Sequence, residues 1–277
     1  MTAVRRTCAG WESHMHGRQS TKCGRSLRGA FTCFALLVLA LALLAPVAAS
    51  AAPAVTFKST ALPIPGFPGT GDILGAGTEV EVESTITGTE YGGFPSPLVL
   101  LTIDSPAGTK VDSNGFATCA QAVLEADGPR GCPKKSRAGP VGEGLGIVSF
   151  GHEQVREKVS IQGFFAPGNT LIFFVDGTTP TSLEIIEKAH WVSGPAPFGP
   201  EAIVELPLVE TVPGALDASI LSFKVTVGAA YKKGKKTVSY ITLPKKCPRG
   251  GFLLKSQFKF YSGESTTVTY KPPCPKK

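Results

Sequence analysis

The 277-residue sequence predicts an all-β fold, an antiparallel β-sandwich of the jelly-roll or immunoglobulin-like type, that follows an N-terminal signal segment. Three observations support this prediction. Many short runs alternate apolar and polar residues, as strands with one buried face do. Glycine (32 residues) and proline (23 residues) separate these runs at intervals typical of turns. The one long apolar stretch is confined to the first fifty residues.

The N-terminal stretch is typical of a secretory signal peptide. Four basic residues precede an apolar run over residues 31–45 that ends at Pro46, and the small residues Ala49, Ser50 and Ala51 follow. The basic residues are Arg18, Lys22, Arg25 and Arg28. We therefore expect residues 1–51 to be a signal peptide, with Met15 as an alternative start. The other interpretation is an uncleaved anchor, which would be the chain's only contact with a membrane.

The rest of the chain, residues 52–277, is expected to be one β-sandwich region, with a division near residues 193–217 as the alternative. Without the leader it carries 22 basic and 20 acidic residues, a formal charge of +2. These charges are unevenly distributed. Residues 52–217 hold 9 basic and 19 acidic residues, whereas residues 218–277 hold 13 basic and one acidic residue. Opposite charges of this size indicate that the two parts pack together or face different partners.

Strands are predicted wherever the alternation or a β-branched, aromatic composition is clear. These segments are 79–86, 97–104, 146–150, 159–166, 170–177, 182–192, 202–209, 221–227, 237–243, 252–260 and 266–270. Hairpin turns are expected at residues 167–169 and at Gly234. The alanine-rich segment 116–125 predicts a short helix, with a strand as the alternative. The glycine-rich segment 139–146 predicts a flexible turn.

Four cysteines remain after the leader: Cys119, Cys132, Cys247 and Cys274. An even number in an exported chain indicates disulfides, and four cysteines allow three pairings. We favour Cys119 with Cys132 and Cys247 with Cys274, because each pair closes one local loop. Zinc is the weaker alternative, since the spacing contains no C-x-x-C pair.

The leader, the segments NGFATC and GCPKKSRAG, and the long basic tail that begins TVPGALDASILSF together resemble uncharacterised secreted proteins of actinobacteria. The resemblance covers residues from about Pro97 onward. It implies export and the same frame of cysteines. No function attaches to that group, so the resemblance implies no chemistry.

No catalytic motif is recognisable, and we expect no catalytic residue, cofactor or metal site. His152 and His190 are the only histidines after the leader, and neither lies in a motif. Glu79, Glu81 and Glu83 alternate on one strand face, and Glu184 and Glu187 are interpreted as the solvated face of another. Four aromatic residues are candidates for stacking on sugar rings, although Trp191 is expected in the core. They are Trp191, Tyr91, Tyr231 and Tyr261.

The basic C-terminal part holds the candidate binding residues. Lysines crowd a predicted hairpin tip and the turn at Cys247, where they would bind an anionic ligand or solubilise turns. These residues are Lys232, Lys233, Lys235, Lys236, Lys245, Lys246 and Arg249. The sequence thus predicts a binding or structural protein, secreted or held at the cell surface, whose partner is an anionic cell-envelope polymer or another surface protein, and not nucleic acid. A secreted hydrolase or carbohydrate-active enzyme is the alternative.

Overall fold

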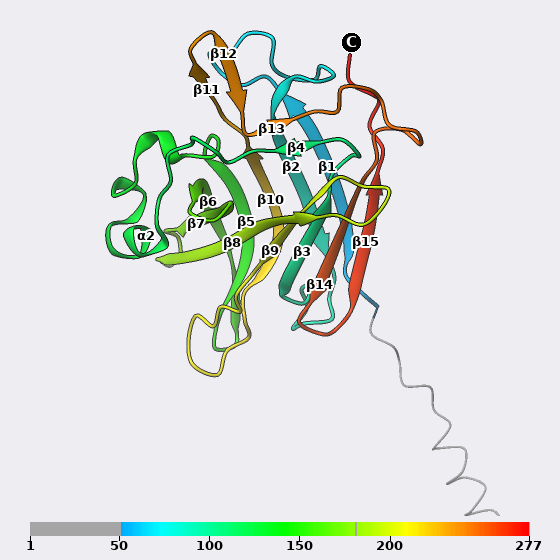
Figure 1. The fold of residues 1–277 in the computed structure, drawn as a ribbon. Coiled ribbons are helices and arrows are strands. Elements are labelled where there is room, and N and C mark those ends of the chain that lie inside the picture. Colours follow the sequence, from blue (N-terminus) through cyan, green and yellow to red (C-terminus); the bar gives the residue numbers. More distant parts are fainter. Residues whose placement is uncertain (1–50, 181, 277) are drawn as a thin grey trace, which may run out of the picture. The chain divides into compact units, whose positions relative to one another are not determined.

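The structure is a computed structural model that describes residues 51–180 and 182–276 (Figure 1). These residues form an all-β fold built on a large antiparallel sheet, which confirms the predicted fold class. The predicted signal peptide lies almost wholly outside the described residues. Within them, no helix has the length and apolarity that a membrane crossing requires.

Fifteen strands follow one another along the described residues. The strands are β1 (Ala54–Leu62), β2 (Gly77–Thr87), β3 (Leu98–Asp104), β4 (Lys110–Val111), β5 (Gly142–Phe150), β6 (Glu153–Ala166), β7 (Thr170–Gly177), β8 (Leu183–Ser193), β9 (Pro200–Glu205), β10 (Ser219–Val227), β11 (Ala230–Lys233), β12 (Lys236–Ser239), β13 (Ile241–Thr242), β14 (Leu254–Phe260) and β15 (Ser265–Tyr270). The helical elements are α2 (Gln121–Asp127) and two 3₁₀ turns, η1 (Gly128–Arg130) and η2 (Lys134–Ser136).

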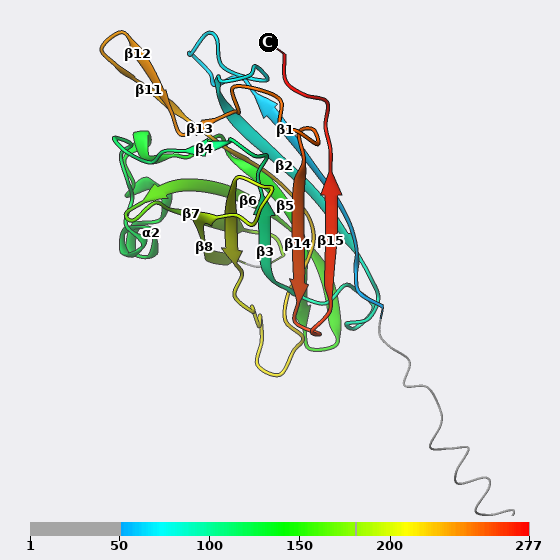
Figure 2. The same ribbon diagram turned by 45° about the vertical axis from the view of Figure 1, so that its right-hand side comes forward.

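Thirteen strands belong to one sheet in the order β15-β14-β3-β9-β8-β7-β6-β5-β10-β2-β13-β4, and β1 also pairs with β2. The sheet curls until β15 lies beside β1 (Figures 1 and 2). There the Thr266 hydroxyl donates a hydrogen bond to the Pro53 carbonyl at 2.6 Å, and Phe57 meets Phe258 edge-on at 6.3 Å. Opposite parts of the inner face of the sheet are therefore turned toward each other across the interior.

The predicted sandwich subtype is not confirmed, because its two separate sheets are replaced by one continuous curled sheet. Alternation along a strand shows only that one face is buried. It does not show whether that face meets a second sheet or the far side of the same one. The remaining two strands, β11 and β12, form a separate hairpin.

The basic C-terminal part contributes inner strands of this sheet. Strand β10 lies between β5 and β2, and β14 lies between β15 and β3. The segment considered as a domain division contains β9, which pairs with both β3 and β8. Hydrogen bonding thus continues across it.

Most predicted strands are present, with the hairpin turn at residues 167–169 and the turn at Gly234. The prediction of a flexible turn at residues 139–146 was wrong, because Gly142 begins β5. A Cβ at Gly142 would lie 2.4 Å from the Lys224 carbonyl oxygen, so glycine allows β5 to approach β10 closely. Strands β1, β4 and β11 were not predicted. The strand predicted over 202–209 stops at Glu205, before Pro207.

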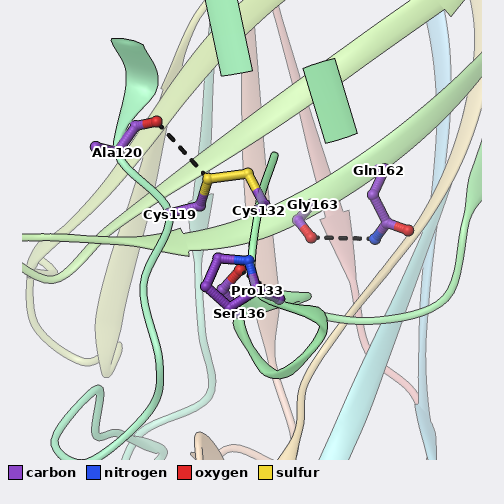
Figure 3. The surroundings of a disulfide bond; sticks show 7 residues. All are labelled: Cys119, Ala120, Cys132, Pro133, Ser136, Gln162 and Gly163. Carbon is purple, nitrogen blue, oxygen red and sulfur yellow. Dashed lines mark hydrogen bonds between the residues drawn. A yellow bond between two sulfur atoms is a disulfide. The ribbon is translucent and has the colours of Figure 1, made fainter. Parts of the chain in front are cut away.

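The segment between β4 and β5 covers the outer face of β6, β7 and β8. Its helix α2 starts at Gln121, later than predicted, and buries Leu124 against Phe164, Ile172 and Phe174. Figure 3 shows the disulfide between Cys119 and Cys132. Both cysteines belong to the same cluster. A hydrogen bond from the Gln162 side chain to the Gly139 carbonyl, at 3.0 Å, ties the end of the segment to β6. The side chains of this cluster on β6 and β7 are therefore buried beneath the segment.

Candidate functional site: an apolar cavity inside the sheet

The interior of the curled sheet is hollow. It holds a cavity of about 420 Å³ to which every strand of the large sheet except β4 contributes lining residues. Valine, leucine, isoleucine, alanine and phenylalanine make up most of the wall. Their side chains come from the inward positions of the strands, so the cavity is the space that the inner face fails to fill.

Strands β7 and β8 show how the wall is made. In their antiparallel register Leu171 pairs with Ala189 and Val175 with Ile185, and all four line the cavity. Between these pairs, Phe173 stands opposite Glu187, which also lines the cavity. A single carboxyl group therefore interrupts an otherwise apolar stretch of wall.

Glu187 is partly buried and lines the cavity. Desolvation by this burial raises the pKa of Glu187 from 4.5 to about 7. No hydrogen-bond or ion-pair partner of Glu187 is found within residues 51–180 and 182–276. The interpretation of Glu187 as a solvated residue was wrong. Glu184 is exposed. Residues three apart on a strand point to opposite faces, so the spacing between Glu184 and Glu187 was the signal that Glu187 faces inward.

Two further polar features border the cavity and are already engaged. Glu157 of β6 is buried, and its Oε1 accepts a hydrogen bond from the Thr179 amide at 3.0 Å. Trp191 of β8 lines the cavity and donates from Nε1 to the Tyr240 hydroxyl at 2.8 Å. Burial raises the pKa of Tyr240 well above its usual range. Trp191 is therefore part of the wall, as its predicted core position implied, and not an exposed sugar platform.

The cavity extends toward both ends of the sheet. At one end its lining includes Asp72, Pro106 and the pair Pro272–Pro273, which come from loops. At the other end it includes Pro207 and Val209, from the loop between β9 and β10. This loop lies at the bottom of Figures 1 and 2, whereas the C-terminus lies at the top.

The predicted basic residues gather at the end with the C-terminus. We call this surface the basic end; it comprises Lys232, Lys233, Lys235, Lys236, Lys245, Lys246 and Arg249, all exposed. Both the β11–β12 hairpin and the loop after β13 lie at the top of the two views (Figures 1 and 2). The loop between β1 and β2 touches both groups, because Lys232 Nζ lies 5.7 Å from the centre of the Phe67 ring and Gly75 donates to the Pro244 carbonyl.

The second disulfide, between Cys247 and Cys274, lies at the basic end. It is one of the two pairs that the sequence favoured, as is Cys119–Cys132. Beyond it, Lys276 donates from its amide to the Asp72 carbonyl at 3.2 Å and accepts from the Leu74 amide at 2.8 Å. The chain after β15 is thereby fastened beside the Asp72 end of the cavity.

The other sequence candidates lie at separate places, except that Tyr91 and Tyr261 are in contact. His152 is exposed in the β5–β6 turn, and His190 is on the outer side of β8. Glu81 pairs with Lys224 at 3.3 Å, and no metal-binding cluster of His, Cys, Asp and Glu occurs among the described residues. Two tyrosines, Tyr91 and Tyr261, meet edge-on at 6.2 Å. Tyr231 donates to the Asn114 carbonyl.

Comparison of the chain with protein-family models, with curated proteins and with solved structures gives no match.

Proposed function

We propose that this protein is exported and binds a small, largely apolar molecule inside its curled sheet. The observation that carries the proposal is the cavity of about 420 Å³ with its apolar wall. This size lies in the range of roughly 300–1,000 Å³ that is usual for small-molecule sites. Two disulfides support export, because such bonds persist in oxidising compartments.

A hollow interior is unusual for a protein of this size. Interiors normally pack to the density of organic crystals, and a void leaves its lining without van der Waals partners. Burial of apolar ligand surface contributes about 25 cal/mol for each Å² removed from water. A ligand that fills the cavity would gain this free energy and would also restore the missing contacts.

The test is a substitution that places a larger side chain in the cavity from one strand. Val204 of β9 faces the cavity, whereas its neighbour Ile203 faces outward. We expect Val204→Phe to weaken binding of the neutral apolar dye Nile red at least about tenfold, a change of about 1.4 kcal/mol. The matched variant Ile203→Phe should bind the dye as the unaltered protein does. Equal binding by both variants, or no binding by the unaltered protein, would exclude the cavity as a site.

A second function is favoured by the basic end. We propose that it docks on an anionic polymer of the cell envelope. The two lysine-bearing groups share one end of the sheet, and Lys233, Lys235 and Lys236 project at the hairpin tip. Exposed ammonium groups bind phosphate or carboxylate groups as point charges, and added salt screens this attraction. Docking there would leave the rest of the sheet free.

Retention on purified cell walls tests the docking function. Replacing Lys233, Lys235 and Lys236 with glutamine should reduce retention at low salt, and moderate salt should release the unaltered protein. The control replaces Lys134, Lys135 and Lys158, which are exposed elsewhere, and removes the same charge. If neither added salt nor replacement of the hairpin lysines changes retention, these lysines only solubilise the protein.

A further inference from the structure

We propose that Glu187 makes the cavity selective for an apolar amine, whose hydrocarbon part fills the cavity while its nitrogen pairs with the Glu187 carboxyl group. The inference rests on the proposed function, because it requires that the cavity hold a ligand. It adds the chemical class of that ligand and the residue that selects it.

The first support is the position of Glu187 in the wall. Its cross-strand neighbour is Phe173, and the next inward residues along β8 are Ile185 and Ala189. None of these side chains offers a hydrogen bond. A polar group buried without a partner is destabilising, so a ligand that supplies the partner recovers the lost free energy. The nitrogen of an amine supplies one at this point of the wall.

The second support is the charge of the wall. Among the described residues no lysine, arginine or histidine lines the cavity, whereas Asp72, Glu157 and Glu187 do. Tyr270 is the other titratable lining residue. An anionic head group, such as that of a fatty acid, would find no cation and would be repelled. The pair of a carboxyl group and an amine is neutral overall, whichever atom holds the proton.

Protonation of Glu187 gives the selectivity a pH dependence. Burial raises the pKa of Glu187 to about 7, and an aliphatic amine in water stays protonated well above that pH. Above pH 7 the carboxylate and the ammonium ion combine with no net proton exchange. Below pH 7 both partners carry a proton and binding releases one. The affinity for an amine should then fall up to about tenfold for each pH unit below 7.

The test compares three ligands of one chain length on the purified protein: dodecylamine, dodecanol and dodecanoate. Isothermal titration calorimetry at pH 8 should show dodecylamine binding about 10- to 100-fold more tightly than dodecanol, and dodecanoate more weakly than dodecanol. Glu187→Gln should remove the preference for the amine. Glu184→Gln, on the exposed side of the same strand, should keep it. At pH 5.5 the affinity for dodecylamine should drop while that for dodecanol changes little.

The outcomes separate the two proposals. If dodecanol binds but dodecylamine binds no more tightly, or if Glu187→Gln keeps the preference, the role of Glu187 is refuted and the cavity remains a binding site. If none of the three ligands binds below its micelle concentration, the proposed function fails as well. An amine preference that persists in Glu187→Gln but disappears when Asp72 is replaced would assign the selection to the end of the cavity.

Discussion

The two faces of strands β6 and β7 are made of the same residue types and are packed in opposite ways. On the outer face Phe164, Ile172 and Phe174 lie under the segment closed by Cys119–Cys132, and all three are buried. On the inner face Phe173 and Val175 border the 420 Å³ cavity. Hydrophobicity therefore does not separate the face that stabilises the fold from the face that offers a site. Filling does.

The largest expected effect comes from truncating one phenylalanine on each face. Phe164→Ala should lower the free energy of unfolding by about 3–5 kcal/mol, because it opens a void in a closed cluster. Phe173→Ala should cost at least about 1 kcal/mol less, since one side of this ring already faces empty space. Urea unfolding of both variants gives the two values. Equal losses would indicate that the inner face is filled in solution.

The two disulfides provide the next contrast. Replacing Cys119 and Cys132 with alanine should cost about 3 kcal/mol, because the bond closes a loop with a sequence separation of 13. Nile red should still bind the folded variant, since this bond is on the outer face. Replacing Cys247 and Cys274 should cost a similar amount and also weaken dye binding, because Pro272 and Pro273 line the cavity beside Cys274. Loss of binding from the first change alone would contradict the division between the faces.

The last expected effect, no larger than that of losing a disulfide, is a pH dependence of stability. Since the pKa of Glu187 is about 7 in the folded protein and about 4.5 when unfolded, the folded state binds more protons between these values. Stability conferred by the neutral carboxyl group is complete below pH 4.5 and is lost as the pH rises to about 7. The stability of Glu187→Gln relative to the unaltered protein should therefore increase by up to about 3 kcal/mol from pH 4 to pH 8.

Thermal unfolding of both proteins across this pH range measures the difference, so that contributions from other groups cancel. Glu184→Gln serves as the control and should show no such trend, because Glu184 is exposed. A flat difference for Glu187→Gln would mean that water reaches its carboxyl group.

Local patterns predicted most of the strands and favoured the disulfide pairs that the structure contains. Alternation in β10 and β14, and turns at Gly168 and Gly234, depend on neighbours in sequence and could be read directly. The curl of the sheet depends on β1 meeting β15, more than 200 residues apart in the chain, and no local pattern encodes it. The cavity follows from that curl, so Glu187 could be assigned to the buried face only by its spacing from Glu184.

The contact of β1 with β15 also determines when, during and after synthesis of the chain, the enclosed interior can form. Strand β2 pairs with β10 and β13, and β3 pairs with β14. Strands that are synthesised early therefore pair with strands that are synthesised late. Pairings of such long sequence separation form slowly, over milliseconds to seconds. A chain still in synthesis has no enclosed space to occupy, so the ligand must be acquired after the last strand is in place. We accordingly expect a chain that ends before Leu254 to bind no Nile red, and dye binding by such a chain would contradict this order of events.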